Sequence, residues 1–469
     1  MSEDKAVSSK TRTYAKTHWS ATPLVHILRP MQEFIHQSQA GGIVLLIMTV
    51  LALVIANSPL GETYDAILHE YISIYVGPWV LKETVLHWIN DGLMVIFFFV
   101  VGLEIKRELM VGELSNPRAA ALSIMAAIGG VVVPALLYTV FNWGLPSADG
   151  WGVPMGTDIA FALGCLALLG SRVPFGLKVF LTAVAIVDDL IAVLVIAVFY
   201  SGDLNFVMLG IGFGVLGLLL LANLFGFQNP IIYGGLGIIV WVTFLNSGVH
   251  ATIAGVLVAL TIPARSRIDA PTFLGRARHI VAQLESSMTG GQSKRSAEFQ
   301  QSAVLELEGI SEQAQAPLQK MEHRLHGVVT FVIMPVFALA NAGVVISGDS
   351  FSSEMMPIMS GIVVGLLIGK PLGIFGAGWL AVRSGIATLP QGSSWLHLLG
   401  VGVLAGLGFT MSIFIASLAF TDVAHLSAAK ISILIASAIA GTVGVFLLSR
   451  VPAAQSQPVK RVVEVEEVG

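Results

Sequence analysis

The sequence contains very little cysteine and very little charge. Its 469 residues include a single cysteine, Cys165, which excludes an intramolecular disulfide framework. Charged residues make up 12% of the chain and the formal net charge is −4, which is too small to indicate nucleic acid or another polyionic partner. Neither property predicts a soluble partner, and neither identifies a substrate.

Apolar residues and glycine are abundant instead. Hydrophobic residues make up 55% of the chain, and 49 residues are glycine, which is common in transmembrane helices. Apolar stretches recur at a length close to the roughly 20 residues that span a bilayer. We therefore predict an all-α polytopic membrane protein with about 12 transmembrane helices. The predicted spans are 41–57, 90–110, 119–140, 152–170, 175–200, 206–224, 231–246, 248–262, 327–347, 358–382, 396–420 and 428–449.

The distribution of lysine and arginine predicts the orientation. With the N-terminus inside, 22 of the 25 basic residues fall in interior segments. Only Lys82 and Lys430 fall outside, and Lys370 lies within a span. Because cytoplasmic loops carry an excess of Lys and Arg, both termini are expected to be cytoplasmic. The first forty residues are too long and too mixed for a signal peptide, so the first span is expected to be retained.

The spans divide the chain into consecutive segments. An external loop, 58–88, contains the alternating stretch "YISIYVGPWVL" (71–81), which predicts a small β-hairpin turning at Gly77 and Pro78. A lone hairpin is marginal in water, so a partner subunit is expected. The predicted segments are a cytoplasmic N-terminal segment (1–40), spans one to eight (41–262), a cytoplasmic connecting segment (263–326), spans nine to twelve (327–450) and a cytoplasmic tail (451–469).

The connecting segment is charged and has a middle rich in Gly, Ser and Gln. It suits either short amphipathic helices around a flexible centre or a solvated linker, and its composition favours the linker.

Three charges lie at the middle of predicted spans. Asp188 and Asp189 interrupt the apolar run "AVAIVDDLIAVLVIA", and Lys370 has a similar depth in its own span. A single Asp and Lys could form a structural ion pair that locks two helices together. One lysine neutralises only one carboxylate, however, and a buried charge costs several kcal/mol. The second aspartate therefore needs a proton or a cation.

A further acid lies in "WGVPMGTDIAFALG", where Pro154, Gly156, Thr157 and Asp158 interrupt a helical pattern. Unwound backbone at membrane depth is tolerated only inside the protein or along a cavity. Carboxylate, hydroxyl and carbonyl oxygens suit a hard cation such as Na+ or Li+, and nothing nearby favours a soft metal. A kinked helix with Asp158 capping its broken end fits the same residues.

The order of the spans predicts inverted-topology repeats. Spans three to five and ten to twelve cross the membrane in opposite senses, and the middle member of each triplet is interrupted. Span four has the break at Asp158, and span eleven is interrupted by a run of glycines: Gly400, Gly402, Gly406 and Gly408. Two interrupted helices, four and eleven, in corresponding positions are typical of a transporter with a site at the midplane.

Six motifs together resemble the bacterial Na+/H+ antiporter NhaA family. They are "INDGLMVIFFFVVGLEIKREL", "GTDIAFALGCLALLGSRVP", "AIVDDL", "SGVHATIAG", "MPVFALANAG" and "GLLIGKPLGI", in order from the second span to the tenth. This family is itself among the standard examples of inverted-repeat transporters, so the agreement in architecture is a match of pattern. The resemblance implies twelve helices and electrogenic exchange of cytoplasmic Na+ or Li+ for external protons. It also implies a homodimer with an external β-hairpin, in the bacterial inner membrane, with no enzymatic activity and no cofactor.

The resemblance also implies roles for individual residues. Asp188 and Asp189 match the aspartate pair that binds the cation and protons in turn, and Lys370 matches the lysine that pairs with Asp188. Thr157 and Asp158 lie in the break of span four, where Asp158 would compensate the helix ends. Asp91, in "NDG" at the outer start of span two, looks like another family acid, although a helix cap would explain it equally well.

A second group of residues is assigned by the resemblance to pH-dependent activation. Histidine titrates around neutrality, and interfacial charges or caps would explain the same residues. The group consists of Glu104, Arg107 and Glu108 in span two, Glu322, His323 and His326 near span nine, and His250 on the external side.

Other functional classes fit less well. An intramembrane aspartyl protease needs its two aspartates on different helices, whereas Asp188 and Asp189 are adjacent. A cation-coupled symporter could use the same fold, because inverted repeats and broken helices serve both activities. The aspartate pair and the membrane lysine favour antiport. A channel is disfavoured by buried titrating acids with no repeated ring of charges.

Overall fold

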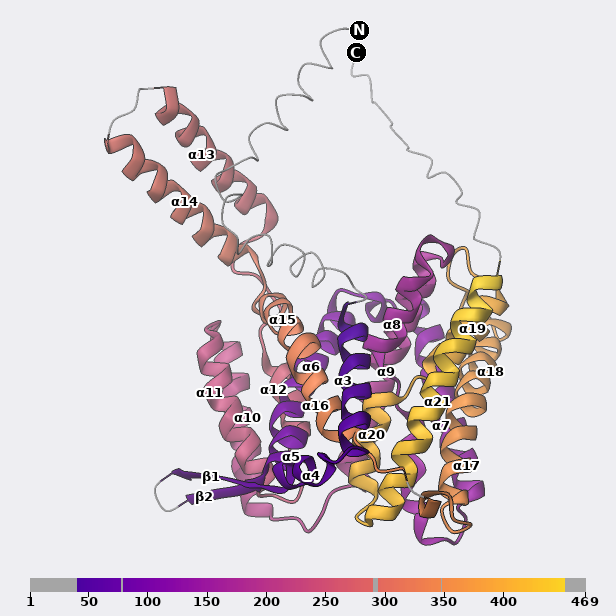
Figure 1. The fold of residues 1–469 in the computed structure, drawn as a ribbon. Helices are drawn as coiled ribbons and strands as arrows, with labels where there is room; N and C mark the ends of the chain where they lie inside the picture. The colour runs from indigo at the N-terminus through magenta and orange to yellow at the C-terminus, as the bar shows by residue number, and fades with distance from the viewer. Residues whose placement is uncertain (1–39, 77–78, 290–293, 347, 452–469) are drawn as a thin grey trace.

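The computed structural model describes residues 40–76, 79–289, 294–346 and 348–451. Most of the predicted N-terminal segment and C-terminal tail lie outside these ranges. The described chain is a bundle of apolar helices with one small two-stranded sheet (Figure 1), as the fold prediction requires.

Seven helices in the described residues are long and apolar enough to cross a membrane. They are Val85–Met110 (α5, η2, α6), Ala120–Phe141 within α7 (Pro117–Phe141), α9 (Phe175–Phe199), α10 (Phe206–Leu224), Pro317–Asn341 (α15, η6, α16), Met356–Arg383 (α17, η8, α18) and α21 (Val423–Arg450).

Five shorter or bent apolar segments complete the set. Three are bent pairs: α3 (Ala40–Ala56) with α4 (Gly61–His69), η4 (Pro146–Met155) with α8 (Ile159–Leu168), and α19 (Trp395–Ala405) with α20 (Phe409–Ala419). Two are short apolar helices, α11 (Pro230–Leu245) and α12 (Thr252–Thr261). With the seven long helices they correspond one to one with the twelve predicted spans. Helix α4 was not predicted; it turns away from α3 by 110°.

Proline explains two π-helical turns inside the long helices. The turn Val329–Ile333 (η6) is followed by Pro335, and the turn Gly365–Gly369 (η8) is followed by Pro371. Proline has no N–H for the carbonyl one turn before it, so the regular ladder is interrupted there. The second turn places Lys370 directly after the interruption.

Helices α7 and α18 touch backbone to backbone. A Cβ added to Gly129 would lie 2.2 Å from the Gly373 carbonyl oxygen, and one added to Gly373 would lie 2.0 Å from that of Gly129. Only glycine at both positions permits this approach. Because Lys370 lies one turn before Gly373, the contact fixes the lysine against α7, which is the third span.

The predicted β-hairpin is present. Strand β1 (Tyr71–Val76) pairs antiparallel with β2 (Trp79–Thr84), with Tyr71 opposite Thr84 and Val76 opposite Trp79. The predicted turn residues Gly77 and Pro78 lie outside the described residues. In Figure 1 the hairpin projects sideways from the bundle, close to α4 and α5.

The connecting segment is helical, so its interpretation as a solvated linker is wrong. Helices α13 (Ala270–Thr289) and α14 (Lys294–Ala314) form an antiparallel hairpin with a small core of Ile280, Ala303 and Ile310. The core residues recur at helical spacing, and this periodicity outweighs the Gly- and Ser-rich composition near the turn. The next helix, α15 (Pro317–Val328), begins ten residues before the predicted start of span nine.

Candidate ion-binding site

The two interrupted helices meet at their breaks. The backbone is extended at Gly156 and Asp158, between η4 and α8, and the other break lies between α19 and α20. The Asp158 N–H donates to the Leu407 carbonyl at 2.6 Å, which joins the two breaks directly. A Cβ at Gly156 would lie 3.0 Å from the Met411 side chain, so the approach depends on glycine there.

Asp158 caps two helices at this crossing. Its Oδ1 accepts the Phe161 N–H at 3.0 Å, at the start of α8. Its Oδ2 accepts the Thr410 N–H at 3.3 Å and the Thr410 hydroxyl at 2.5 Å, at the start of α20. Helix N-termini carry partial positive charge, which a carboxylate stabilises. The buried Asp158 thus lies where compensation of the broken helix ends was expected.

Lys370 and Asp188 form a fully buried ion pair. The Lys370 ammonium lies 2.7 Å from Asp188 Oδ2, which also accepts the Thr157 hydroxyl at 2.8 Å. Lys370 donates in addition to the Met155 carbonyl, at the end of η4. The interruptions of the two broken helices therefore supply a carbonyl acceptor to Lys370. They also supply hydroxyl donors to the aspartates.

Asp189 has no such partners. Both of its carboxylate oxygens, and Oδ1 of Asp188, are buried without a hydrogen-bond partner among the described residues. Buried polar atoms are normally paired, and an ionised carboxylate left unpaired at this depth is very costly. Three unpaired oxygens on adjacent residues therefore mark a place for a proton or a cation. With the Thr157 hydroxyl, they are hard ligands suited to Na+ or Li+.

A cavity of about 280 Å³ leads to this place. Asp189, Thr157 and Asp158 lie along it together with Glu104 and His326. Glu104 belongs to the C-terminal end of α6 (Met94–Met110), which the distribution of basic residues places on the cytoplasmic side. The cavity thus connects the unpaired carboxylates with the predicted cytoplasmic end of the bundle.

Aromatic residues pack tightly toward the other end. Phe414 of α20 lies 5.5 Å from Phe98 of α6 and 6.2 Å from Phe337 of α16 (Met334–Asn341), measured between ring centroids. His250 contacts Phe414 at 5.6 Å, and the three phenylalanines are fully buried. We refer to Phe98, Phe337 and Phe414 as the aromatic barrier. A cavity therefore reaches the candidate site from the predicted cytoplasmic side, and the aromatic barrier packs on the side toward His250.

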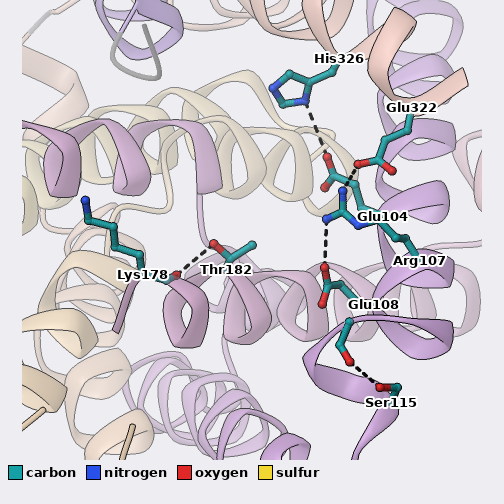
Figure 2. Close-up of polar contacts among 9 residues, drawn as sticks. Glu104, Arg107, Glu108, Ser115, Lys178, Thr182, Glu322 and His326 are labelled. Carbon is teal, nitrogen blue, oxygen red and sulfur yellow. Dashed lines mark hydrogen bonds and ion pairs between the residues drawn. The ribbon is translucent and has the colours of Figure 1, made fainter. Parts of the chain in front are cut away.

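Most residues that the resemblance assigns to pH response lie in one cluster, and two of them, Glu104 and His326, line the cavity. Figure 2 shows Glu104, Arg107 and Glu108 of α6 facing Glu322 and His326 of α15. Arg107 bonds both Glu322 and Glu108, the latter at 3.0 Å, and His326 Nδ1 lies 3.8 Å from Glu104. His323 is exposed and does not take part in these ion pairs.

His250 belongs to a different cluster at the opposite end of α6. Its Nε2 lies 3.4 Å from Asp91 Oδ1, and His87 Nε2 lies 2.8 Å from Asp91 Oδ2. Asp91 is inside the π-helical turn Trp88–Leu93 (η2) and does not cap the helix, so that interpretation is wrong. The carboxylate instead links two histidines from different elements.

Three participants were not predicted from the sequence: the Met155 carbonyl, Thr410 and His87. A carbonyl leaves no signal in a residue pattern. Thr410 follows the glycine run of span eleven, so its place after a predicted break was a usable signal. His87 lies four residues before Asp91, one helical turn away, and that spacing was also visible.

Comparison with known proteins agrees with these features. The model of a family described as Na+/H+ antiporter 1 matches residues 32–448. The chain belongs to this family. A relative from Oleidesulfovibrio alaskensis, named Na(+)/H(+) antiporter NhaA, is 50% identical over 438 residues, which cover 93% of this chain and 97% of the relative. The protein named Na(+)/H(+) antiporter NhaA 2 of Syntrophotalea carbinolica is 47% identical, over 92% and 98% of the two chains. The protein named Na(+)/H(+) antiporter NhaA 1 of Saccharophagus degradans is 46% identical, over 92% and 93%.

Membership of the Na+/H+ antiporter family confirms the resemblance that the six motifs indicated. The match extends across both broken helices, so the candidate site lies wholly inside it. Together with its membrane-spanning helices, the family makes this chain a multi-pass bacterial membrane protein.

Proposed function

We propose that the protein is an electrogenic antiporter that exports Na+ or Li+ in exchange for protons, serving sodium and pH homeostasis. It works in the bacterial inner membrane with both termini in the cytoplasm. The observation that carries the proposal is the set of three unpaired, buried carboxylate oxygens on Asp188 and Asp189, at the end of a cavity. The names of the relatives support the choice of ions.

The cation and protons compete for the aspartate pair. Na+ entering the cavity reaches Asp189 first, since Asp189 lies along the cavity wall. It then recruits Asp188 Oδ1, which has no competing partner. Binding between two carboxylates weakens the hold of Lys370 on Asp188 and requires both acids to be deprotonated. Protonation from the other side reverses each step and expels the cation.

The number of protons exchanged per Na+ determines whether the membrane potential helps to drive export. If two protons enter for each Na+ that leaves, one net charge moves inward, and the membrane potential contributes about 2.3 kcal/mol per 100 mV. One proton is carried by Asp189. The second is carried either by Asp188 or by Lys370, and because these groups are coupled the pair titrates as a unit.

Alternating access requires the aromatic barrier to open. Phe414 belongs to a broken helix that carries the site, whereas Phe98 and Phe337 belong to other helices. Moving α20 away from α6 and α16 separates the rings and exposes Asp189 to the opposite side.

The ion pairs around Glu104, Arg107 and His326 regulate access to the cavity according to pH, because histidine titrates around neutrality.

The protein also forms a homodimer through its external β-hairpin, because a lone two-stranded sheet is marginal in water.

Reconstituted liposomes test the transport proposal. The purified protein is placed in vesicles that contain a pH dye, a proton gradient is imposed, and Na+, Li+ or K+ is added. Na+ and Li+ should collapse the gradient and K+ should not. Asp189→Asn should abolish the response, whereas Asn223→Ala, distant from the site on α10, should keep it. Undiminished cation-dependent proton flux in Asp189→Asn would refute the assigned site, and its absence from the wild type would refute antiport.

A further inference from the structure

Asp91 joins two histidines that differ in their access to solvent. Its Oδ2 lies 2.8 Å from His87 Nε2, and its Oδ1 lies 3.4 Å from His250 Nε2. The His87 side chain is 41% exposed, whereas the side chains of Asp91 and His250 are 10% and 12% exposed. We call His87, Asp91 and His250 the external triad. It leads from the predicted external surface into the bundle.

The packing of α12 against α6 fixes the inner half of the external triad. A Cβ added to Gly255 of α12 would lie 2.3 Å from the Val95 carbonyl oxygen of α6. The two backbones therefore touch one helical turn after Asp91 and five residues after His250. The Thr252 hydroxyl, at the start of α12, lies 2.7 Å from His250 Nδ1. These contacts hold the His250 ring with its Nε2 toward Asp91.

The inner end of the external triad touches the aromatic barrier. The His250 ring lies 5.6 Å from the Phe414 ring, in an edge-to-face arrangement. Phe414 belongs to α20, the helix whose movement opens the barrier in the proposed transport cycle. Displacement of Phe414 therefore uncovers His250 when Asp189 becomes open to the external side.

The groups of the external triad can pass a proton inward. Imidazole accepts a proton at one nitrogen and donates one from the other, and it does so near neutral pH. His87 takes a proton from external water and, as the imidazolium, donates its Nε2–H to Asp91 Oδ2. The carboxyl group then turns and donates this proton to His250 Nε2. Each group passes on as many protons as it receives, so the charge of the external triad is restored once His250 releases its proton.

The surroundings of the external triad favour uptake of a proton from outside. Glu83 faces His87, with its carboxylate 3.8 Å from His87 Nε2, and its negative charge stabilises the protonated imidazole. The side chains that reach this region from α11 and α16, Trp241 and Asn341, are neutral. The charges that face the two histidines are therefore the carboxylates of Glu83 and Asp91.

We propose that the external triad is the route by which external protons reach the ion-binding site, with His87 as the residue that takes them from water. The inference rests on the proposed antiport and identifies how its protons are supplied. Delivery through His87 limits exchange when external protons are scarce, at alkaline external pH. It does not change how cytoplasmic Na+ binds, because Na+ enters through the cavity on the other side of Asp189.

Sodium export from oriented membrane vesicles tests the route. Vesicles with the external face outward are loaded with radioactive Na+, a membrane potential negative inside is imposed, and initial rates are measured at external pH of about 6 and about 9. His87→Gln should export several-fold more slowly than the wild type at the alkaline pH and similarly at the acidic pH. His69→Gln is the matched control, because His69 also pairs with an aspartate four residues away, Asp65, on the predicted external side. It should behave as the wild type at both values.

A buffer added outside distinguishes proton delivery from a structural role. Raising the external concentration of a buffer that does not cross the membrane should bring His87→Gln several-fold closer to the wild-type rate at alkaline pH. The KM for internal Na+ should stay unchanged. Equal rates of His87→Gln and His69→Gln, or a slow rate that the buffer does not raise, would overturn the route while wild-type export leaves antiport intact. Absence of export from the wild type would refute antiport and the route together.

Discussion

Lys370 and Asp188 lie 2.7 Å apart with no exposure to solvent, and they come from different helices, α18 and α9. Removing one member of a buried pair leaves the other charge uncompensated, which costs about 3–5 kcal/mol. We therefore expect Lys370→Met to lower the free energy of unfolding by about that amount. Thermal unfolding in detergent measures the effect.

A double variant distinguishes the effect of the unpaired charge from the effect of packing around the lysine. Lys370→Met combined with Asp188→Asn removes both charges, so it should recover much of the stability while transport stays absent. If the double variant were as unstable as Lys370→Met alone, the loss would come from packing around the lysine rather than from the unpaired acid.

Thr410 holds Asp158 through its hydroxyl. Thr410→Val keeps the volume but removes the donor, leaving Asp158 Oδ2 with only the backbone N–H at 3.3 Å. A buried acceptor that loses its partner costs about 1–3 kcal/mol. We expect a loss of stability of this size and weaker Na+ binding in Thr410→Val, with both near wild type in Thr410→Ser. Equal behaviour of the two variants in thermal unfolding would exclude a role for the hydroxyl.

The backbone contact between α7 and α18 predicts that alanine is tolerated much less well at Gly129 than at Gly376. Gly129→Ala places a methyl group against the Gly373 carbonyl, whereas a Cβ at Gly376 meets nothing within 4 Å. Overpacking of this kind costs about 1–3 kcal/mol. Gly129→Ala should therefore unfold at a lower temperature and displace Lys370 enough to reduce transport. Gly376→Ala should retain both properties, and a comparable loss in it would argue against the contact.

Histidine at the cavity mouth should control the acid side of the pH profile. A protonated His326 adds positive charge beside Glu104, on the route that Na+ takes to Asp189. Transport should accordingly fall as pH drops through the range in which histidine gains its proton. His326→Asn should shift this decline to lower pH, and His323→Asn, which changes an exposed residue outside the cluster, should not. Initial rates across roughly pH 6 to 9 decide between these outcomes.

Much of the fold and of the site could be predicted because charge in an apolar run is costly. Asp188, Asp189 and Lys370 stood out for that reason, and Pro154 and Gly156 marked the first break. Partners contributed by the backbone could not be found in this way. The Met155 and Leu407 carbonyls become acceptors only when two broken helices cross, and no residue pattern encodes that crossing.

In the connecting segment, by contrast, the sequence contained the signal and the prediction gave it too little weight. Its composition near the turn suggested a linker, although Phe273, Ala277, Ile280 and Leu284 already had the spacing of one helical face. Composition averages over the segment, whereas periodicity reports which residues can be buried together. A pattern with a period of 3.6 should therefore outweigh a Gly- or Ser-rich neighbourhood.

The central claim is that Na+ and protons compete for Asp188 and Asp189. Calorimetry of Na+ binding to the purified protein, in buffers of different ionisation enthalpy, measures the protons released per ion bound. The account predicts release of at least one proton and an apparent affinity that rises about tenfold per pH unit for each proton released. Asp189→Asn should show neither. Na+ binding without proton release, and with the same affinity at every pH, would contradict the account.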